Sequence, residues 1–287
     1  AEMGGSQIWL EYGEQLTVDE MLKAIVVVSA NDCTVAMAEH LAGSEENFVA
    51  RMNERAAELG MVNTTFKNCT GLPTEGHLTT ARDIALMTCE LSKHDAIFNY
   101  TTIWMDSLRG GAMGLSNTNK LIRFYPGATG MKTGYTSSAG YCLSATATRD
   151  GMSLVATMMK SKTSAERFAD AKKLLDYGFA NYSVYKCDDT AVEPVTVKGG
   201  KTENLSLTYG GCSVLLPKGR EKKVEVVLEL PDYVTAPINE GEVIGKARFV
   251  IDKEEIAVRD ITAAETVERL GVIDIIDKIF KKLMLFR

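Results

Sequence analysis

The chain has 287 residues, of which 45% are apolar and 24% are charged, a balance typical of one large or two ordinary globular domains. Its net charge is −6, and the absence of a basic stripe argues against a nucleic-acid partner. No apolar run reaches about 18 residues, the length that indicates a transmembrane helix. The sequence opens at Ala1 without an initiator methionine, so we expect that a leader and more are removed upstream.

The six cysteines are widely spread and form no Cys-x-x-Cys pair. This spacing argues against a zinc site, and a chain of this length needs no disulfide framework. No metal ligands cluster in the sequence, and no cofactor is expected. Cys33, Cys89 and Cys142 lie in apolar-periodic stretches, where a free buried thiol is the ordinary outcome. The redox state of the cysteines and the compartment stay open on this basis.

The first 92 residues are predicted to form helices. Thr17–Glu20 is a capping box, because its threonine hydroxyl and glutamate carboxylate satisfy the first free backbone amides. The apolar run Met21–Val28 follows, then a break at Ser29–Asp32 and a second helix to about Gly43. Two further helices are predicted over about 45–59 and from Thr80 to about 92.

From Gly127 the pattern changes to strands. Residues 127–130 are predicted as a turn, followed by short strand-like residues 131–135. Two longer strands, 139–148 and 152–160, are joined by the hairpin signal Arg149–Gly151. A helix over about 165–179 carries apolar residues on one face. The first domain is therefore predicted as α/β (α+β), with helices packed against an antiparallel sheet.

Two further segments are predicted after residue 186. Short β-rich runs separated by Gly, Pro and Lys turns indicate a small all-β domain over 187–262. Residues 263–287 show helical apolar spacing, with Lys278, Lys281, Lys282 and Arg287 adding positive charge. An amphipathic helix of this kind either lies in a membrane interface or docks on a protein, and its periodicity alone favours neither.

Two short segments carry residues suited to chemistry. Lys132-Thr133-Gly134 places a cation, a hydroxyl and a residue without a side chain next to one another. Because Gly134 has no side chain, an extended peptide can approach the strand edge there. Ser29-Ala30-Asn31 lies about one hundred residues earlier, at the break between two helices. Each tripeptide alone is a weak signal, since serine and asparagine are common helix caps.

Taken together and in this order, the segments resemble those of the D-alanyl-D-alanine carboxypeptidases, which are penicillin-binding serine peptidases. The resemblance covers most of residues 1–186. The blocks that carry it are Ala24–Asp32 with Val35–Glu39, then Asn63–Phe66 with Gly71–Pro73 and His77–Asp83, and finally Tyr125–Gly127 with Gly130–Thr136 and Ala139–Tyr141.

The resemblance implies a serine β-lactamase-like, penicillin-binding transpeptidase-like domain over 1–186, N-terminally truncated. A β-rich domain over 187–262 and a membrane-anchoring amphipathic helix over 263–287 complete the implied plan. The implied location is the cell envelope, with peripheral attachment to the outer face of the cytoplasmic membrane. The implied partners are the peptidoglycan pentapeptide, β-lactam antibiotics and the membrane surface.

The resemblance also implies roles for individual residues. Ser29 relays a proton, Asn31 holds the amide of the substrate, and Lys132 is the lysine of the third motif. Thr133 binds the terminal carboxylate of the peptide, and Lys132, Thr133 and Gly134 together form the substrate-binding strand. Arg167 matches an arginine that helps to hold this carboxylate, although its local sequence alone would place it on a solvated helix face. His77 is expected to be structural.

One departure from the family matters. The nucleophile belongs to a Ser-x-x-Lys motif that should precede Ser29 by several dozen residues, and no such motif stands before Ser29. The only Ser-x-x-Lys is Ser183–Lys186, in the wrong order and place, which we interpret as coincidence. We therefore expect these 287 residues to be inactive alone, although we expect the parent protein to be active.

Two alternatives remain. A non-catalytic wall-binding scaffold of the same fold is kept open by the missing Ser-x-x-Lys. A β-lactamase is less favoured, because Glu75 and Glu90 are not followed by the asparagine that a deacylating glutamate requires.

Overall fold

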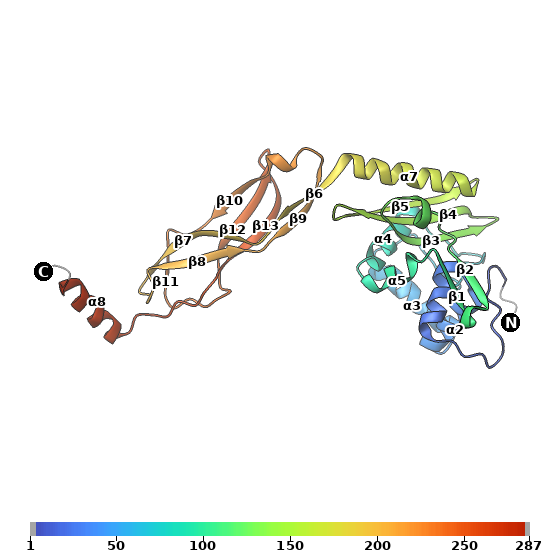
Figure 1. The fold of residues 1–287 in the computed structure, drawn as a ribbon, viewed down its shortest axis with the longest axis horizontal. Helices are drawn as coiled ribbons and strands as arrows, with labels where there is room; N and C mark the ends of the chain where they lie inside the picture. The colour runs from blue at the N-terminus through green and yellow to red at the C-terminus, as the bar shows by residue number, and fades with distance from the viewer. Residues whose placement is uncertain (1–3, 285–287) are drawn as a thin grey trace. The chain divides into compact units, whose positions relative to one another are not determined.

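The computed structural model describes residues 4–284, and it divides into two compact units, residues 1–180 and 181–287. Each unit is described by itself (Figure 1). The division falls after Ala180, whereas the sequence-based boundary follows Lys186. The reason is that strand β6 (Tyr182–Cys187) pairs with a strand of the second unit. Ala1, Glu2 and Arg287 lie outside the described residues.

The centre of the first unit is a three-stranded antiparallel sheet in the order β3-β4-β5. Its strands are β3 (Ala128–Thr136), β4 (Gly140–Arg149) and β5 (Met152–Ser161). Asp150 and Gly151 join β4 to β5, and both have positive φ, as a two-residue hairpin turn requires. The predicted hairpin is confirmed. The predicted turn at 127–130 is too long, because β3 begins at Ala128 and absorbs an irregularity before Gly130.

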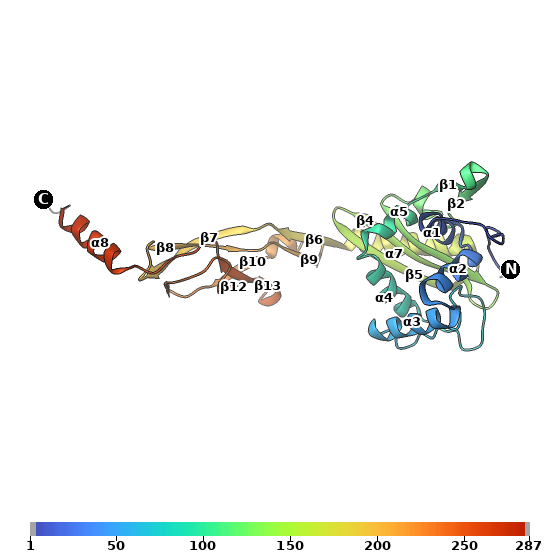
Figure 2. The same cartoon turned by 90° about the horizontal axis from the view of Figure 1, so that it is seen from below.

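Helices cover both faces of this sheet. The long helix α7 (Ser164–Asn181) lies along one face, and the other helices lie on the opposite face (Figures 1 and 2). Those helices are α1 (Val18–Lys23), α2 (Asn31–Ala42), α3 (Glu45–Glu58), α4 (Ala81–Leu91), α5 (Phe98–Thr101) and α6 (Leu121–Phe124). A small ribbon of β1 (Met105–Leu108) and β2 (Met113–Ser116) lies beside them.

The predicted helix boundaries follow from local capping. Thr17 accepts a hydrogen bond from the backbone of Glu20, and the Glu20 carboxylate accepts from the backbone of Thr17, which confirms the capping box. Ser44 and Thr80 cap α3 and α4 in the same way through their hydroxyls. Gly43 ends α2 in the left-handed conformation that glycine adopts without strain.

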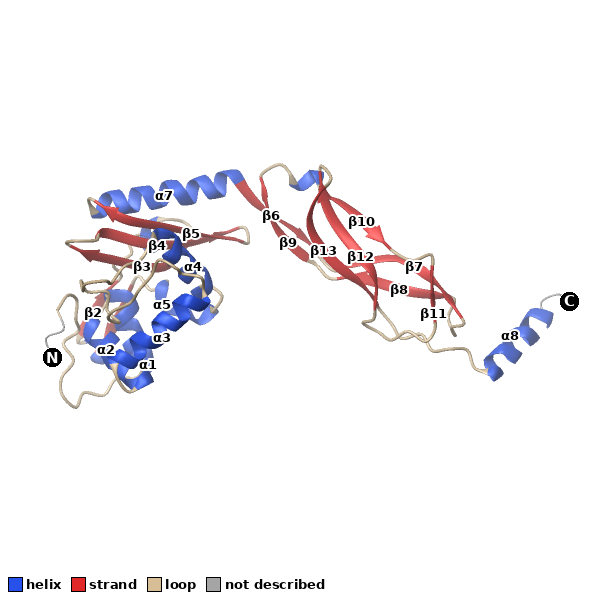
Figure 3. Ribbon diagram, turned by 180° about the vertical axis from the view of Figure 1, so that it is seen from behind, coloured by secondary structure: helices blue, strands red, loops and turns tan. Residues whose placement is uncertain are grey.

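The second unit contains two sheets of different size (Figure 3). The larger sheet has six strands in the order β10-β12-β13-β8-β7-β11, and only β11 runs parallel to its described neighbour. Its strands are β7 (Thr190–Lys198), β8 (Asn204–Tyr209), β10 (Glu225–Glu229), β11 (Tyr233–Thr235), β12 (Val243–Ile251) and β13 (Glu254–Ala263). The smaller sheet pairs β6 with β9 (Cys212–Pro217).

The core of the second unit centres on Phe249, which is fully buried. The rings of Tyr185 and Tyr209 lie edge-on to it, with centroids at 6.3 and 5.9 Å. Edge-to-face pairs of this kind add to the hydrophobic stabilisation of the buried rings. They also join the small sheet to the large one, because Tyr185 lies on β6 and Phe249 on β12.

Helix α8 (Val272–Met284) forms the last described segment. It begins where Gly271 donates its backbone N–H to Asp274. The helix is shorter than the predicted tail, because residues 263–271 still belong to β13 and to extended bridges with the sheet. The side chains of Lys278, Lys281 and Lys282, which carry the predicted basic charge, lie outside what the structure describes.

Candidate active site

Ser29 stands at an unusual turn between α1 and α2. A π-helical turn, Ala24–Val28, widens the end of the first helix, and the N–H of Ala30 reaches back to Ala24 O at 3.1 Å. Ser29 itself has left-handed backbone angles, φ 65° and ψ 39°. For a residue other than glycine this conformation costs on the order of 1 kcal/mol. The turn therefore holds the serine in a strained position that marks a candidate site.

Lys132 of β3 meets Ser29 directly. Its Nζ donates a hydrogen bond to Ser29 Oγ at 2.9 Å and another to the backbone oxygen of Thr133 at 3.1 Å. The two predicted segments, Ser29-Ala30-Asn31 and Lys132-Thr133-Gly134, are thus brought together by the fold.

The environment of Lys132 changes its proton affinity. Burial lowers the pKa of the Lys132 ammonium to about 8, and the positive charge of Arg167 acts in the same direction. A group with a pKa in this range exchanges protons readily near neutral pH, as acid–base catalysis requires. The Lys132–Ser29 pair can therefore move a proton between its two side chains.

Thr133 is buried, and its hydroxyl lies 2.7 Å from the hydroxyl of Thr118. Thr118 is anchored by its own N–H, which donates to Val27 O at 3.2 Å. Sequence reasoning missed Thr118, since no motif surrounds it. Only the tertiary fold brings the segment 116–119 between Val27 of the π-helical turn and strand β3.

Gly134 lies on a strand edge that is open to a ligand. It is exposed, and a Cβ added to it would meet nothing within 4 Å. Strand β3 pairs with β4 on one side, and no described strand pairs with its other side. An extended peptide can therefore add to this edge through backbone hydrogen bonds.

Arg167 lies in the same region, buried rather than solvated. It donates from one guanidinium nitrogen to Gly134 O and to Cys142 O, both at 3.2 Å. Burial lowers the pKa of its guanidinium, and its Nε is buried without a hydrogen-bond partner among residues 4–284. A buried N–H of this kind lowers the stability of the fold unless it donates a hydrogen bond to a ligand or to water. The local expectation of a solvated arginine is wrong, because α7 packs this side chain behind β3.

Asn31 is held by the segment that precedes the first helix. Its Nδ2 donates to Gly4 O at 2.9 Å, and its backbone N–H donates to Ser6 O at 2.8 Å. A Cβ added to Gly5 would lie 2.6 Å from Nδ2, so the backbone passes very close to the amide. These contacts fix the orientation of the Asn31 side chain.

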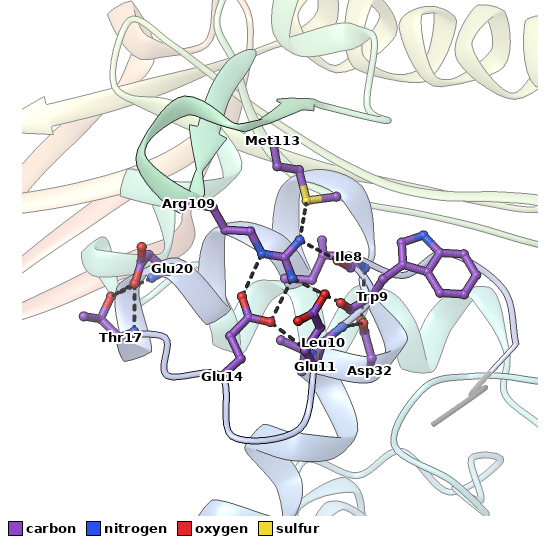
Figure 4. Close-up of polar contacts among 10 residues, drawn as sticks. All are labelled: Ile8, Trp9, Leu10, Glu11, Glu14, Thr17, Glu20, Asp32, Arg109 and Met113. Atoms are coloured by element: carbon purple, nitrogen blue, oxygen red, sulfur yellow. Dashed lines mark hydrogen bonds and ion pairs between the residues drawn. The ribbon is translucent and has the colours of Figure 1, made fainter.

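The neighbouring Asp32 and Arg109 secure this N-terminal segment (Figure 4). Asp32 accepts hydrogen bonds from the N–H groups of Ile8 at 3.3 Å and Leu10 at 3.0 Å. Arg109 makes a two-pronged contact with Glu14, at 2.7 and 2.9 Å, and its guanidinium also donates to Ile8 O at 3.0 Å. Hydrogen bonding from Arg109 holds the pKa of the Glu14 carboxyl below its usual range.

A cavity of about 770 Å³ adjoins Lys132. Apolar side chains of α4 and of the sheet form most of its wall, together with the loop over residues 66–79. His77 also lines it, with Nδ1 accepting from the N–H of Lys67 at 3.3 Å and its ring edge-on to Phe66 at 5.9 Å. An apolar hollow of this size beside a polar site is suited to an apolar segment or ligand.

Asp83 joins two of the sequence blocks that define this wall. It accepts hydrogen bonds from the N–H of Asn63 at 2.9 Å and from the hydroxyl of Thr64 at 2.8 Å. Burial raises the pKa of the Asp83 carboxyl, but these hydrogen bonds outweigh it and hold the pKa below its usual range. The block over 63–66 and the start of α4 are therefore linked by one carboxylate.

Comparison with known proteins identifies the family of the chain. Residues 1–163 match the model of the peptidase S11 family, described as D-alanyl-D-alanine carboxypeptidase. The chain belongs to the D-alanyl-D-alanine carboxypeptidase family. Residues 179–269 match a second model, the C-terminal domain of penicillin-binding protein 5. The predicted family and fold class, a penicillin-binding domain followed by an all-β domain, are confirmed.

Individual carboxypeptidases of this family are similar over most of the chain. D-alanyl-D-alanine carboxypeptidase DacF of Bacillus subtilis is 44% identical over 281 residues, covering 95% of this chain and 72% of its own length. DacC of Escherichia coli is 35% identical, covering 93% and 68%. The crystal structure of penicillin-binding protein 5 from Haemophilus influenzae is 30% identical with a TM-score of 0.73, covering 92% of this chain and 78% of that one.

Ser183–Lys186 does not have the geometry of a carboxypeptidase nucleophile. The four residues lie on strand β6, where residues three apart point to opposite faces. The Ser183 hydroxyl donates to Glu221, and Lys186 is exposed. A helical turn is needed to bring a Ser-x-x-Lys lysine back over its serine.

The described part of the chain contains no cluster of three or more His, Cys, Asp or Glu side chains suited to a metal ion. Among the described helices, none is long and apolar enough to cross a membrane.

Proposed function

We propose that this protein is a serine-type D-Ala-D-Ala carboxypeptidase that removes the terminal D-alanine from peptidoglycan stem peptides through an acyl-enzyme. The observation that carries the proposal is the 2.9 Å hydrogen bond from Lys132 to Ser29 beside the open strand edge at Gly134. β-Lactams acylate the same nucleophile, because their strained amide resembles the peptide bond that is cleaved.

The substrate peptide lies along β3 in this proposal. Its terminal carboxylate accepts hydrogen bonds from the Thr133 hydroxyl and meets the positive charge of Lys132. The Thr118 and Thr133 hydroxyls share a hydrogen bond in which either can donate, and when Thr118 donates, the Thr133 hydroxyl proton points at the carboxylate. Arg167 acts from behind the strand, where it holds Gly134 O and adds positive charge.

Asn31 and Ser29 act at the other side of the scissile bond. The Asn31 Nδ2 is engaged by Gly4, which leaves its Oδ1 to accept the N–H of the substrate amide. Ser29 passes a proton to the leaving D-alanine amine, and Lys132 resupplies it through their shared hydrogen bond. Water then hydrolyses the acyl-enzyme and regenerates the nucleophile.

The nucleophile itself is assigned to a segment outside these 287 residues. We propose that a helix carrying Ser-x-x-Lys packs into the cavity of about 770 Å³, which places it next to Lys132. The apolar wall from α4 and the sheet suits the buried face of such a helix. Residues 1–287 alone are then unable to form an acyl-enzyme, although they contain the second and third motifs.

The test is intact-mass spectrometry with benzylpenicillin, on residues 1–287 and on the product of the complete reading frame. We expect one covalent adduct on the longer product only, on a serine that precedes Ala1. A Ser29→Ala variant of that product should acylate much more slowly, whereas the control Ser183→Ala should acylate normally. A folded longer product without any adduct would favour a non-catalytic scaffold, and an adduct on Ser183 would contradict the assignment of the nucleophile.

We also propose that α8 attaches the protein to the outer face of the cytoplasmic membrane. Its apolar residues Ile273, Ile276 and Phe280 are 82%, 54% and 65% exposed. A helix with such an apolar face lies in the interface of a bilayer rather than across it. The location in the cell envelope fits a peptidoglycan substrate.

A further inference from the structure

Two cysteines meet at one end of the small sheet in the second unit. Cys187 is the last residue of β6, Cys212 is the first residue of β9, and the two are directly opposite in the register. Opposed residues of antiparallel strands have Cα atoms about 4.5 or 5.5 Å apart, depending on the type of pair. Both separations lie within the range of about 4.4–6.8 Å that disulfides span.

Both thiols lie on the same face of this sheet. Cys212 is only 4% exposed and belongs to the hydrophobic core of the unit, and Cys187 packs against the same core from a half-buried position. Tyr185 and Val214, two residues away on each strand, contact this core as well. Side chains two apart on a strand share a face, so the two sulfur atoms point to the same side.

The backbone at this end of the sheet is firmly held. The N–H of Gly211 donates to Asp189 at 2.7 Å, and Gly211 O accepts from Arg259 at 3.1 Å. A Cβ added to Gly211 would lie 2.6 Å from Cys187 O, so only glycine allows this close approach. The two cysteines are therefore fixed opposite one another before any bond forms.

We propose that Cys187 and Cys212 form a reversible cross-strand disulfide by exchange with an organic disulfide. The half-buried Cys187 reacts first: its thiolate attacks one sulfur of the organic disulfide and releases one thiolate. The Cys212 thiolate then attacks Cys187 Sγ, forms the protein disulfide and releases the second thiolate. Two protein thiols lose two protons and two electrons, and the organic disulfide is reduced to two thiols.

The disulfide closes the segment 188–211, which contains β7 and β8, and ties β6 to β9. Closing such a loop lowers the conformational entropy of the unfolded chain more than that of the folded chain. The oxidised second unit is therefore the more heat-stable form. This inference does not depend on the proposed catalytic function, because neither thiol belongs to the candidate active site.

The experiment exposes the whole protein to oxidised glutathione and maps its cysteine peptides without reductant. We expect a cross-linked peptide that joins Cys187 to Cys212. Cys187→Ser and Cys212→Ser should each abolish it; Cys212→Ser should leave a glutathione adduct on Cys187, whereas the buried Cys212 should stay unmodified in Cys187→Ser. The control Cys89→Ser, which removes an exposed cysteine of α4, should leave the cross-link unchanged.

A thermal scan gives a second readout. The transition of the second unit should fall by roughly 10 °C when the oxidised protein is reduced, and should not respond to reductant in Cys187→Ser. Separate glutathione adducts on Cys187 and Cys212, or a cross-link to another cysteine, would overturn the proposal. A cross-link without any shift of the transition would overturn its stabilising role.

Discussion

Lys132 donates a hydrogen bond of 2.9 Å to Ser29 across 103 residues of sequence. The bond joins a serine in a left-handed turn to a lysine on the edge strand of the sheet. The strained backbone of Ser29 and the partial burial of the Lys132 ammonium both lower the free energy of unfolding. Replacing either residue by one that relieves this cost should therefore raise stability while activity is lost.

Ser29→Gly and Ser29→Ala form a matched pair. Both remove the hydroxyl and its hydrogen bond to Lys132, but only glycine adopts φ 65° without strain. The glycine variant should be more stable than the alanine variant by about 1 kcal/mol. Urea unfolding of both variants measures this difference. Equal stability, or a more stable alanine variant, would show that the turn is not strained.

Gly134→Val tests whether the strand edge receives the peptide. A Cβ here meets nothing within 4 Å, so the fold should remain as stable as before. The branched side chain would instead occupy the space of a bound peptide, and acylation of the complete protein should slow about tenfold or more. The contrasting variant is Gly130→Val, whose Cβ would lie 3.1 Å from Thr101 and Thr146 and should lower stability. Normal acylation by Gly134→Val would contradict peptide binding at this edge.

The local elements were predictable because their signals are local. The capping box at Thr17, the helix end at Gly43 and the hairpin at Asp150–Gly151 each depend on a few neighbouring residues. Ser29 and Lys132 could be named only because their surrounding blocks resemble a family. Neither tripeptide alone predicts the contact, since no local sequence pattern reveals how a helix break and a strand 103 residues apart will meet.

Other contacts of the site had no sequence signal. Thr118 lies next to Thr133 because the segment between β2 and α6 passes beside β3. Arg167 is buried because α7 packs on β3 and β4. The pairing of Cys187 with Cys212 depends on strand register, which widely spaced cysteines do not reveal. Tertiary packing decides all three, so periodicity and propensity could not predict them.

Lys132→Met tests the electrostatic cost of the buried ammonium through pH. The pKa of Lys132 is about 8 in the folded chain and 10.5 in the unfolded chain. Between these values the unfolded chain holds a proton that the folded chain has lost, so the free energy of unfolding of the wild type rises with pH. The methionine variant lacks this rise. Its stability relative to wild type should be greatest below pH 8 and should decline towards pH 10.5.

Urea unfolding of both proteins at pH 7, 9 and 10 measures this trend. Comparing the two proteins cancels the other groups that titrate in this range. A stability difference that stays constant from pH 7 to pH 10 would contradict the lowered pKa. A difference that grows with pH would mean that the ammonium is stabilised in the folded state, as by an anionic partner.

Ile276→Asp tests membrane attachment through α8. The substitution places a charge on the exposed apolar face and removes an isoleucine worth about 1.5–3 kcal/mol when buried in lipid. Binding to vesicles that contain anionic lipid should therefore weaken by roughly tenfold to a hundredfold in co-sedimentation.

The matched control is Leu174→Asp on α7, since Leu174 is 51% exposed and Ile276 is 54% exposed. The control should bind as the wild type does, because α7 belongs to the first unit and has no assigned contact with lipid. Equal loss in both variants would indicate a nonspecific effect of charge, and no loss in Ile276→Asp would indicate that α8 docks on protein instead.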